Sequence, residues 1–211
     1  MNTKVKICGI HTAKEASFAI SKGADFLGLL VNVPLTNLSI TPVKAKNIVN
    51  THLSGKFILL LTSRSVKKIK EIIKYIQPWG VQLLRPSIKI VESLKKTTSV
   101  KIMPVIHIKN KRTINKALKY AAIADYLLLD TKSGKYLGGT GLVHDWSISR
   151  EIIDKSKVPV FLAGGLNKDN VTLAISKTKP YAVDIESSMR NNEGFRDLKR
   201  VEEFITIAKN V

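Results

Sequence analysis

Short apolar runs alternate with amphipathic stretches along the whole chain. Eight of these runs are rich in Val, Ile and Leu and lack the strict apolar/polar alternation of a half-exposed strand. Continuous apolar runs of this length are typical of strands in a parallel sheet that is covered on both faces. We therefore predict eight buried strands, at residues 5–8, 26–31, 57–61, 81–84, 101–106, 126–130, 158–163 and 181–185.

The stretches between the strands have helical periodicity. In residues 65–76, apolar side chains recur at spacings of three and four and lysines fill the opposite face. Helix openings are predicted at Thr41-Pro42 and at residues 167–170, where a capping side chain or a proline falls in the first turn. Eight strand–helix units in 211 residues leave about 26 residues per unit. This favours a closed (β/α)8 barrel of α/β class, formed by residues 1–211 as one domain, over an open doubly wound sheet.

The composition is that of an ordinary globular protein, with 44% hydrophobic and 24% charged residues. No apolar run approaches the roughly 18 residues that a membrane span requires, and the N-terminus lacks the apolar segment of a signal peptide. We expect a cytoplasmic protein without a membrane partner. The single cysteine, Cys8, excludes an intramolecular disulfide and is either a small core residue or a reactive thiol.

The formal net charge of +19 raises the question of nucleic-acid binding. The lysines are spread over nearly every predicted helix, however, and no arginine-rich block or aromatic-studded basic strand is present. Solvated surface lysine explains this pattern better than a nucleic-acid groove does. The positive field would attract an anionic small substrate. The sequence does not specify an oligomeric state.

Two candidate catalytic residues lie at the carboxyl ends of predicted strands, where parallel α/β folds place their chemistry. Cys8 ends the first strand, and Asp130 ends the sixth before the glycine-rich residues 138–141. A partly desolvated carboxyl group there would have a raised pKa and could act as a general acid. The alternative is that Asp130 is an ordinary turn or capping aspartate.

A candidate phosphate site follows the seventh strand. Gly164 and Gly165 would let backbone N–H groups approach a phosphate, and the next helix would add its positive end. Eight-stranded barrels commonly bind phosphate with the loops after strands seven and eight. The loop after the eighth strand contains Glu186, Ser187 and Ser188.

Taken together, these motifs resemble phosphoribosylanthranilate isomerase, a tryptophan-biosynthesis enzyme, over nearly the whole chain. The matching segments, in order, are residues 6–10, 23–25 with 27–28, 81–83, 127–130, 138–141 with 145–146, 162–166 with 170–171, and 183–184. The resemblance implies a (β/α)8 barrel that catalyses the Amadori rearrangement of N-(5-phosphoribosyl)anthranilate, an aldose–ketose isomerisation. It also implies that no metal or organic cofactor takes part.

The resemblance further implies a role for each matching residue. Cys8 corresponds to the family's general base and Asp130 to its general acid, which would protonate the ribose ring oxygen. Gly164 and Gly165 correspond to the phosphate loop, with Ser187 as a further contact. A thiolate base calls for a lowered pKa and the acid for a raised one.

Four positions depart from the family pattern. Residues 33–39 contain no arginine to hold the anthranilate carboxylate, and Leu84-Arg85 stands where the family commonly has His-Gly. His107 falls where the family often has an arginine, and the usual Ser-Ser-Gly motif reads Glu186-Ser187-Ser188. Arg85 or His107 could hold the anthranilate instead, although a surface charge and a structural histidine are the simpler interpretations. Two alternative functions stay open: an isomerase for another phosphosugar amine, and a catalytically silent binding protein.

Overall fold

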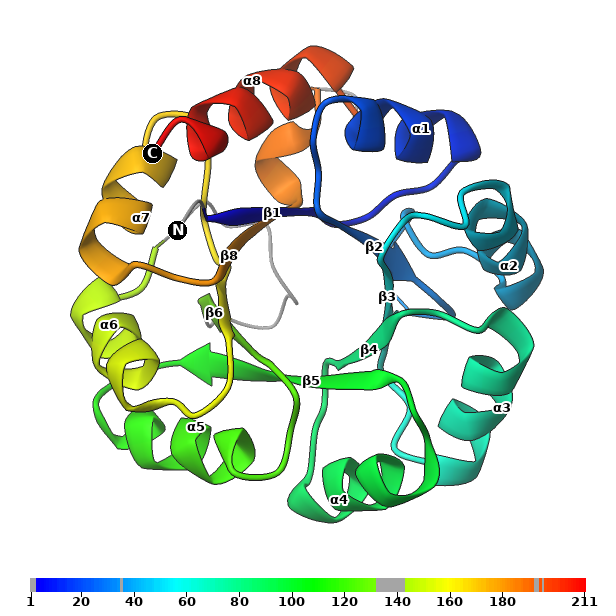
Figure 1. The fold of residues 1–211 in the computed structure, drawn as a ribbon, viewed down its shortest axis with the longest axis horizontal. Helices are drawn as coiled ribbons and strands as arrows, with labels where there is room; N and C mark the ends of the chain where they lie inside the picture. Colours follow the sequence, from blue (N-terminus) through cyan, green and yellow to red (C-terminus); the bar gives the residue numbers. More distant parts are fainter. Residues whose placement is uncertain (1–2, 35, 132–142, 192–193, 195) are drawn as a thin grey trace.

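A closed barrel of eight parallel strands, hydrogen-bonded in the order β1 to β8, forms the centre of the computed structural model. The helices α1 to α8 form a ring around the strands, as the view down the barrel shows (Figure 1). The structure describes residues 3–34, 36–131, 143–191, 194 and 196–211. The (β/α)8 barrel predicted from the sequence is confirmed.

All eight predicted strands are present, with ends that differ from the prediction by at most two residues. β5 extends to Ile108 because its end pairs with Thr131 of β6. β7 begins at Val160, after Pro159, which has no N–H to offer to the ladder. The strands are β1 Lys4–Ile7, β2 Phe26–Leu30, β3 Phe57–Leu61, β4 Gly80–Leu83, β5 Lys101–Ile108, β6 Leu127–Thr131, β7 Val160–Leu162 and β8 Ala182–Ile185.

Capping side chains satisfy early N–H groups at the start of every α-helix except α5 and α7. The hydroxyl of Thr41 accepts from the N–H of Lys44 at the start of α2, and the hydroxyl of Ser65 does the same for α3. No described helix is long and apolar enough to cross a membrane. The helices are α1 Ala13–Ser21, α2 Pro42–Thr51, α3 Val66–Ile76, α4 Ile88–Thr97, α5 Arg112–Ala121, α6 Trp146–Lys155, α7 Val171–Thr178 and α8 Leu198–Lys209, with a short 3-10 helix η1 at Ser187–Met189.

The two faces of the sheet build two cores. The outward-facing side chains pack against the helices, and the inward-facing side chains fill the barrel. At the amino ends of the strands, aromatic rings close the interior with centroids 5.1 to 6.3 Å apart: Phe26, Trp79, Tyr126, Phe161 and Tyr181. The barrel is therefore plugged at this end.

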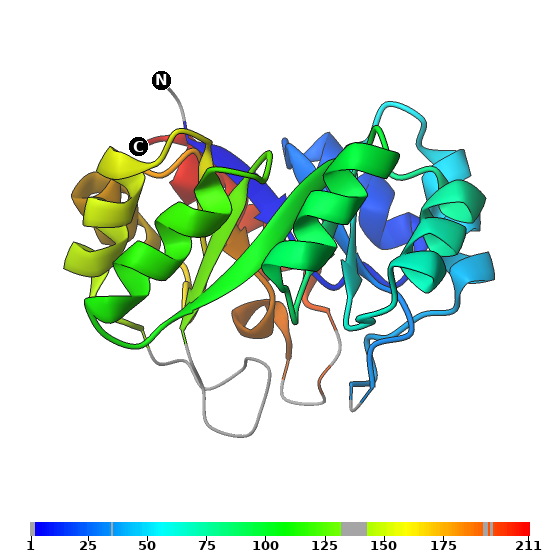
Figure 2. The same cartoon turned by 90° about the horizontal axis from the view of Figure 1, so that it is seen from below.

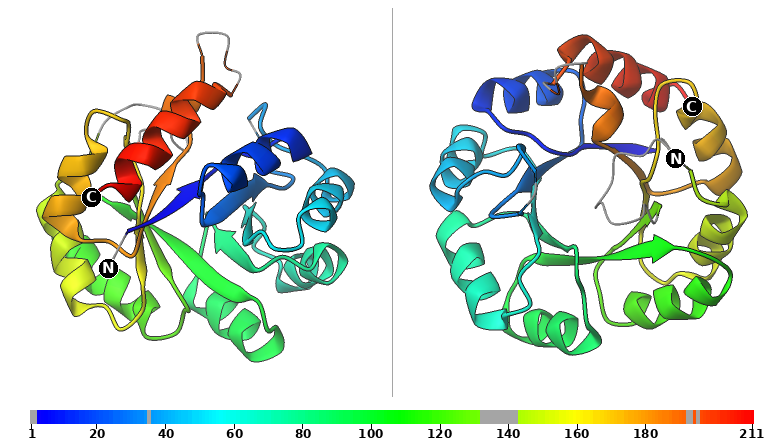
Figure 3. Two further views of the ribbon diagram at one scale, coloured as in Figure 1. Left: turned by 45° about the horizontal axis from the view of Figure 1, so that its top comes forward. Right: turned by 180° about the vertical axis from the view of Figure 1, so that it is seen from behind.

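Both chain termini lie at the plugged end, whereas the segments that follow β2 and β8 lie at the opposite end (Figure 2). The helices α1 and α8 lie side by side next to β1 and close the ring (Figure 3). The opposite end, where the strands finish, is thus the face on which polar side chains can reach a substrate.

Truncating Phe161 should test the aromatic plug. Phe161 is fully buried and contacts three other rings, so Phe161→Ala should lower the free energy of unfolding by about 3–5 kcal/mol in urea denaturation. Leu173→Ala on α7, where the side chain is 49% exposed, should change it by less than about 0.5 kcal/mol. Equal effects of the two substitutions would show that the plug does not stabilise the barrel.

Candidate active site

A buried polar layer lies inside the barrel. The Lys6 side chain of β1 is completely buried, and its Nζ donates to Asp184 Oδ2 of β8 at 2.8 Å and to Gln82 Oε1 of β4 at 2.9 Å. Lys6 and Asp184 are also register partners in the β1–β8 ladder. The interior therefore contains an ion pair that spans the closure between the first and last strands.

The sequence analysis missed this polar layer, although a signal for it was present. Lys6 and Asp184 are charged residues within apolar strands that were predicted to be covered on both faces. A charge that cannot reach water must be paired. Two such charges on strands that become neighbours when the barrel closes indicate an ion pair.

Cys8 lies directly after β1, two residues beyond Lys6, and alternation along the strand gives both side chains the inward direction. The thiol is 4% exposed. Gly28 of β2 makes room for it, because a Cβ on Gly28 would lie 2.7 Å from the sulfur. Cys8 therefore faces the barrel mouth and is enclosed there.

Burial raises the pKa of the Cys8 thiol to about 12. The positive charges of Lys6 and Arg196 oppose this shift, while the negative charges of Asp184 and Glu186 add to it. The expectation of a lowered thiol pKa is therefore wrong. The physical reason is that desolvation of the thiolate outweighs the nearby cations.

Asp130 lies near the end of β6, two residues beyond Leu128, which belongs to the interior core. Alternation therefore points its carboxyl group inward as well. The pKa of Asp130 is raised to about 7, mainly by burial and also by the charges of Asp184 and Glu186. The hydrogen bond from the Thr131 backbone and the charge of Lys6 oppose this shift. A raised pKa at this position was predicted, and the direction is confirmed.

The charges of Lys6, Asp184 and Glu186 act on both Cys8 and Asp130. The two groups therefore share one electrostatic environment at the mouth. A carboxyl group with a pKa of about 7 and a thiol under the influence of the same charges provide a proton donor and, as the thiolate, a proton acceptor for acid–base catalysis.

Arg196 holds the end of β1 from a distant part of the chain. Its side chain is 5% exposed, and its Nη2 donates to the carbonyl oxygens of Cys8 at 2.5 Å and Gly9 at 2.8 Å, while Nε lies 3.8 Å from the Glu15 carboxylate. Arg196 comes from the segment before α8, so the backbone of Cys8 is fixed by the last strand–helix unit. No local pattern around Arg196 indicated this contact.

An aliphatic side chain lies near the place where an arginine was expected. Leu38 comes close to Gly9, since a Cβ on Gly9 would lie 2.7 Å from Leu38 Cδ1. Residues 33–34 and 36–39 are described, and none of them is basic. On this side of the mouth, Leu38 therefore borders Gly9, with the side chains of Arg196 and Glu186 also close to it.

The candidate phosphate loop has a backbone that requires glycine. Gly164 has φ +90°, and a Cβ there would lie 2.4 Å from the backbone nitrogen of Thr131. Ser188 Oγ of η1 donates to the Leu166 carbonyl at 2.6 Å and so joins the loops after β7 and β8. Among the residues that the structure describes, the N–H groups of Gly164 and Gly165 donate to no partner, which leaves them available to an anion.

The remaining predicted residues differ in their placement. His107 pairs with Asp130 in the β5–β6 register and is partly buried at the mouth. Arg85 follows β4 and is exposed. Ser187 opens η1 after β8. The glycine-rich residues 138–141 lie outside the described residues.

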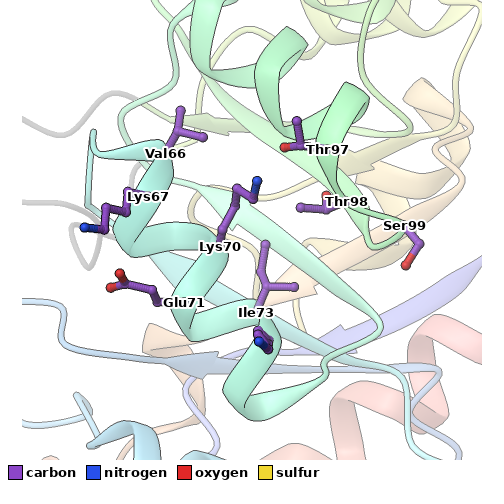
Figure 4. Close-up of a pocket in the computed structure, with 9 residues that line it drawn as sticks. Val66, Lys67, Lys70, Glu71, Ile73, Thr97, Thr98 and Ser99 are labelled. Carbon is purple, nitrogen blue, oxygen red and sulfur yellow. The ribbon is translucent and has the colours of Figure 1, made fainter.

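A separate cavity of about 680 Å³ lies outside the barrel, between α3 and the end of α4. Lysines and hydroxyl groups line it, including Lys67, Lys70, Thr97, Thr98 and Ser99 (Figure 4). Its only carboxylate among the lining residues, Glu71, has no companion acid or thiol there. The acid–base pair at the barrel mouth is therefore the stronger candidate for an active site.

The sequence and the fold are similar to those of known isomerases. A protein-family profile described as "PRAI: N-(5′phosphoribosyl)anthranilate (PRA) isomerase" matches residues 5–207. An N-(5′-phosphoribosyl)anthranilate isomerase from Methanocella arvoryzae is 36% identical over 208 residues, with 96% of each chain covered.

Solved structures agree with these matches. The phosphoribosyl anthranilate isomerase from Thermotoga maritima superposes with a TM-score of 0.88 at 29% identity, covering 99% of this chain and all of that one. A phosphoribosyl anthranilate isomerase in complex with reduced 1-(o-carboxyphenylamino)-1-deoxyribulose 5-phosphate gives a TM-score of 0.85 at 28% identity, with the same coverage.

His144 joins β6 to α6 at the edge of the mouth and should make the fold sensitive to acid. Its Nδ1 lies 3.0 Å from Thr131 Oγ1 and its Nε2 lies 2.6 Å from Ser149 Oγ, and burial lowers its pKa to about 4. In the unfolded chain the His144 ring binds a proton near pH 6.5, whereas in the folded protein it does so only near pH 4. The free energy of unfolding is therefore highest above pH 6.5 and falls as the pH drops towards 4. His144→Gln should remove part of the decrease in melting temperature between pH 7.5 and 4.5.

The matched control for this prediction is His52→Gln, at the end of α2, which leaves the His144 contacts intact. It should retain the wild-type loss of melting temperature on acidification. If the melting temperature of His144→Gln falls on acidification as much as that of the wild type, His144 does not link stability to pH.

Proposed function

The chain belongs to the N-(5′-phosphoribosyl)anthranilate isomerase family, and we propose that Cys8 and Asp130 are the base and the acid of its reaction. The activity is an isomerisation of the aldose–ketose type in tryptophan biosynthesis, in which the phosphoribosyl amine becomes a 1-deoxyribulose phosphate. The observation that carries the assignment of roles is the placement of an enclosed thiol and a carboxyl group with a pKa of about 7 at one barrel mouth.

Asp130 acts first in the proposed sequence. It donates its proton to the ribose ring oxygen as the C1–O bond breaks, and the nitrogen lone pair forms an iminium with C1. Cys8 then removes the proton from C2, and the electrons of that C–H bond form a C1=C2 double bond and neutralise the nitrogen. The resulting enolamine tautomerises to the ketone. A carboxyl group that is protonated near neutral pH fits the first step.

The active form needs a thiolate on Cys8 and a proton on Asp130. This form competes with another form that carries the same number of protons, in which Cys8 is a thiol and Asp130 is ionised. Because the pKa of Cys8 lies well above that of Asp130, the active arrangement is the minor one. Interactions that move the proton from sulfur to carboxyl therefore increase the rate directly.

We infer that the phosphate group binds to Gly164, Gly165 and Ser187. Their backbone N–H groups lie on adjacent loops that Ser188 ties together, and the net positive charge of the protein favours an anionic substrate. In this proposal the phosphate lies beyond the ends of β7 and β8, and Glu186 belongs to the loop after β8.

We also infer that the anthranilate ring lies against Leu38 at the mouth. His107, beside Asp130, is placed to contact the anthranilate, and Arg85 remains a more distant candidate for its carboxylate. Family membership over the whole chain favours the anthranilate substrate over another phosphosugar amine or a silent binding protein. The single domain, the cytoplasmic location and the lack of nucleic-acid binding stay predictions.

Substitution of the two proposed catalytic residues should abolish most of the turnover. Cys8→Ser and Asp130→Asn should each lower kcat by about 10²- to 10⁴-fold, measured by the fluorescence change as N-(5′-phosphoribosyl)anthranilate is consumed. Glu92→Gln on the outer face of α4 should retain wild-type kcat. Wild-type turnover in Cys8→Ser and Asp130→Asn would overturn the assignment.

Substitution of Gly164 should weaken phosphate binding. Because a Cβ would collide with the Thr131 backbone, Gly164→Ala must displace the loop, and KM should rise about tenfold or more. Gly23→Ala is the matched control: its φ is +96°, but the nearest atom to the added Cβ is 3.9 Å away and the residue follows α1, far from the loop. An unchanged KM in Gly164→Ala would exclude this loop as the phosphate site.

A further inference from the structure

A buried ion pair lies beneath the two proposed catalytic groups, and the reaction sequence above does not use it. We propose that Lys6 and Asp184 are positioning residues that control the protonation of the two catalytic groups. Lys6 stabilises the thiolate of Cys8, and Asp184 stabilises the protonated form of Asp130. The proposal rests on the proposed function, because it concerns the acid and base assigned there.

The geometry connects the cation to the thiol. Cys8 lies two residues beyond Lys6 at the end of β1, so both side chains face the interior. Burial alone would lower the pKa of Lys6, and the charges of Asp184 and Cys8 reverse that effect. Lys6 therefore stays charged inside the barrel.

The anion of the pair acts mainly on the other side of the mouth. One oxygen of Asp184 accepts from Lys6, while Oδ1 is buried and has no hydrogen-bond partner among the described residues. Burial raises the pKa of Asp184, while the charge and the hydrogen bond of Lys6 oppose this shift. Lys6 therefore favours the ionised form of Asp184. After burial, its charge is the largest cause of the raised pKa of Asp130.

Other charged groups also face these sites. Glu186 acts on both Cys8 and Asp130, but it forms an ion pair with Arg190. Arg196 acts on Cys8, and His107 is the register neighbour of Asp130. None of these groups belongs to the ion pair inside the barrel, where Lys6 is completely buried and Asp184 is 7% exposed.

The pair has opposite effects on the two groups. Lys6 favours loss of the thiol proton, and Asp184 favours retention of the carboxyl proton. Each residue also acts in the opposite sense on the other group, because Asp184 raises the pKa of Cys8 and Lys6 lowers that of Asp130, but these are the smaller effects. The pair as a whole therefore increases the population with thiolate and carboxylic acid, which the reaction requires. Without the pair, the pKa of Cys8 would lie higher and that of Asp130 lower, and the active form would be rarer.

The single cysteine lets the proposal be tested without substrate, because alkylation by iodoacetamide reports on Cys8 alone. At pH 8, Asp184→Asn should raise the alkylation rate about tenfold or more, since Lys6 then acts unopposed. Lys6→Gln should lower it about tenfold or more. The pH–rate profile of turnover should move to lower pH in Asp184→Asn and to higher pH in Lys6→Gln.

The double variant Lys6→Gln/Asp184→Asn replaces the ion pair by two amides that can still hydrogen-bond, and it carries the test if a single variant does not fold. Its alkylation rate at pH 8 should fall, and the pKa of Asp130 in the pH–rate profile should also fall, so that kcat decreases about tenfold or more. Lys95→Gln/Asp125→Asn is the matched control, since it removes an ion pair with a 2.6 Å contact outside the barrel. It should leave alkylation and the profile at wild-type values.

A purely structural role predicts a different result. In that case the folded Lys6 and Asp184 variants would lose thermal stability but keep the wild-type alkylation rate and an unmoved pH–rate profile, and the proposal would be overturned. Failure of the proposed function is separate: it would appear as full turnover in Cys8→Ser, whatever the alkylation of Cys8 shows.

Discussion

A lysine ammonium inside a closed barrel has to be neutralised, and the architecture around the active site follows from this constraint. Lys6 lies on the first strand and Asp184 on the last, so they meet only because β8 pairs with β1. Removing one partner of such a pair typically costs about 3–5 kcal/mol, because the other charge stays buried. The ion pair thus requires barrel closure and, in turn, forms the floor on which Cys8 and Asp130 lie.

The two ends of the barrel differ in chemistry because the inward side chains change along the strands. Aromatic rings fill the end where the strands begin, the ion pair and Gln82 occupy the middle, and titratable groups emerge where the strands finish. Tightly packed side chains and titratable side chains therefore lie at opposite ends of the barrel. The aromatic plug can hold the strands rigid, while the groups with perturbed pKa values lie at the mouth.

Local patterns were sufficient for the fold and for part of the site. Apolar runs and capping residues predicted the barrel, and strand ends predicted the placement of Cys8, Asp130 and Gly164. The direction of the thiol pKa was not predictable, because the enclosure of Cys8 depends on Gly28 of a neighbouring strand. Arg196 was also missed, since it lies 188 residues from Cys8 in sequence and its contact exists only in the folded chain.

The long sequence separation of these contacts has a consequence for biosynthesis. The strand with Lys6 and the proposed base Cys8 is made before Asp184 and Arg196, which pair with Lys6 and fix the Cys8 backbone. A nascent chain therefore carries an unpaired cation and an unsecured thiol until the segment with Asp184 and Arg196 has been made. The contacts that hold Cys8 in place can form only after this segment docks onto β1.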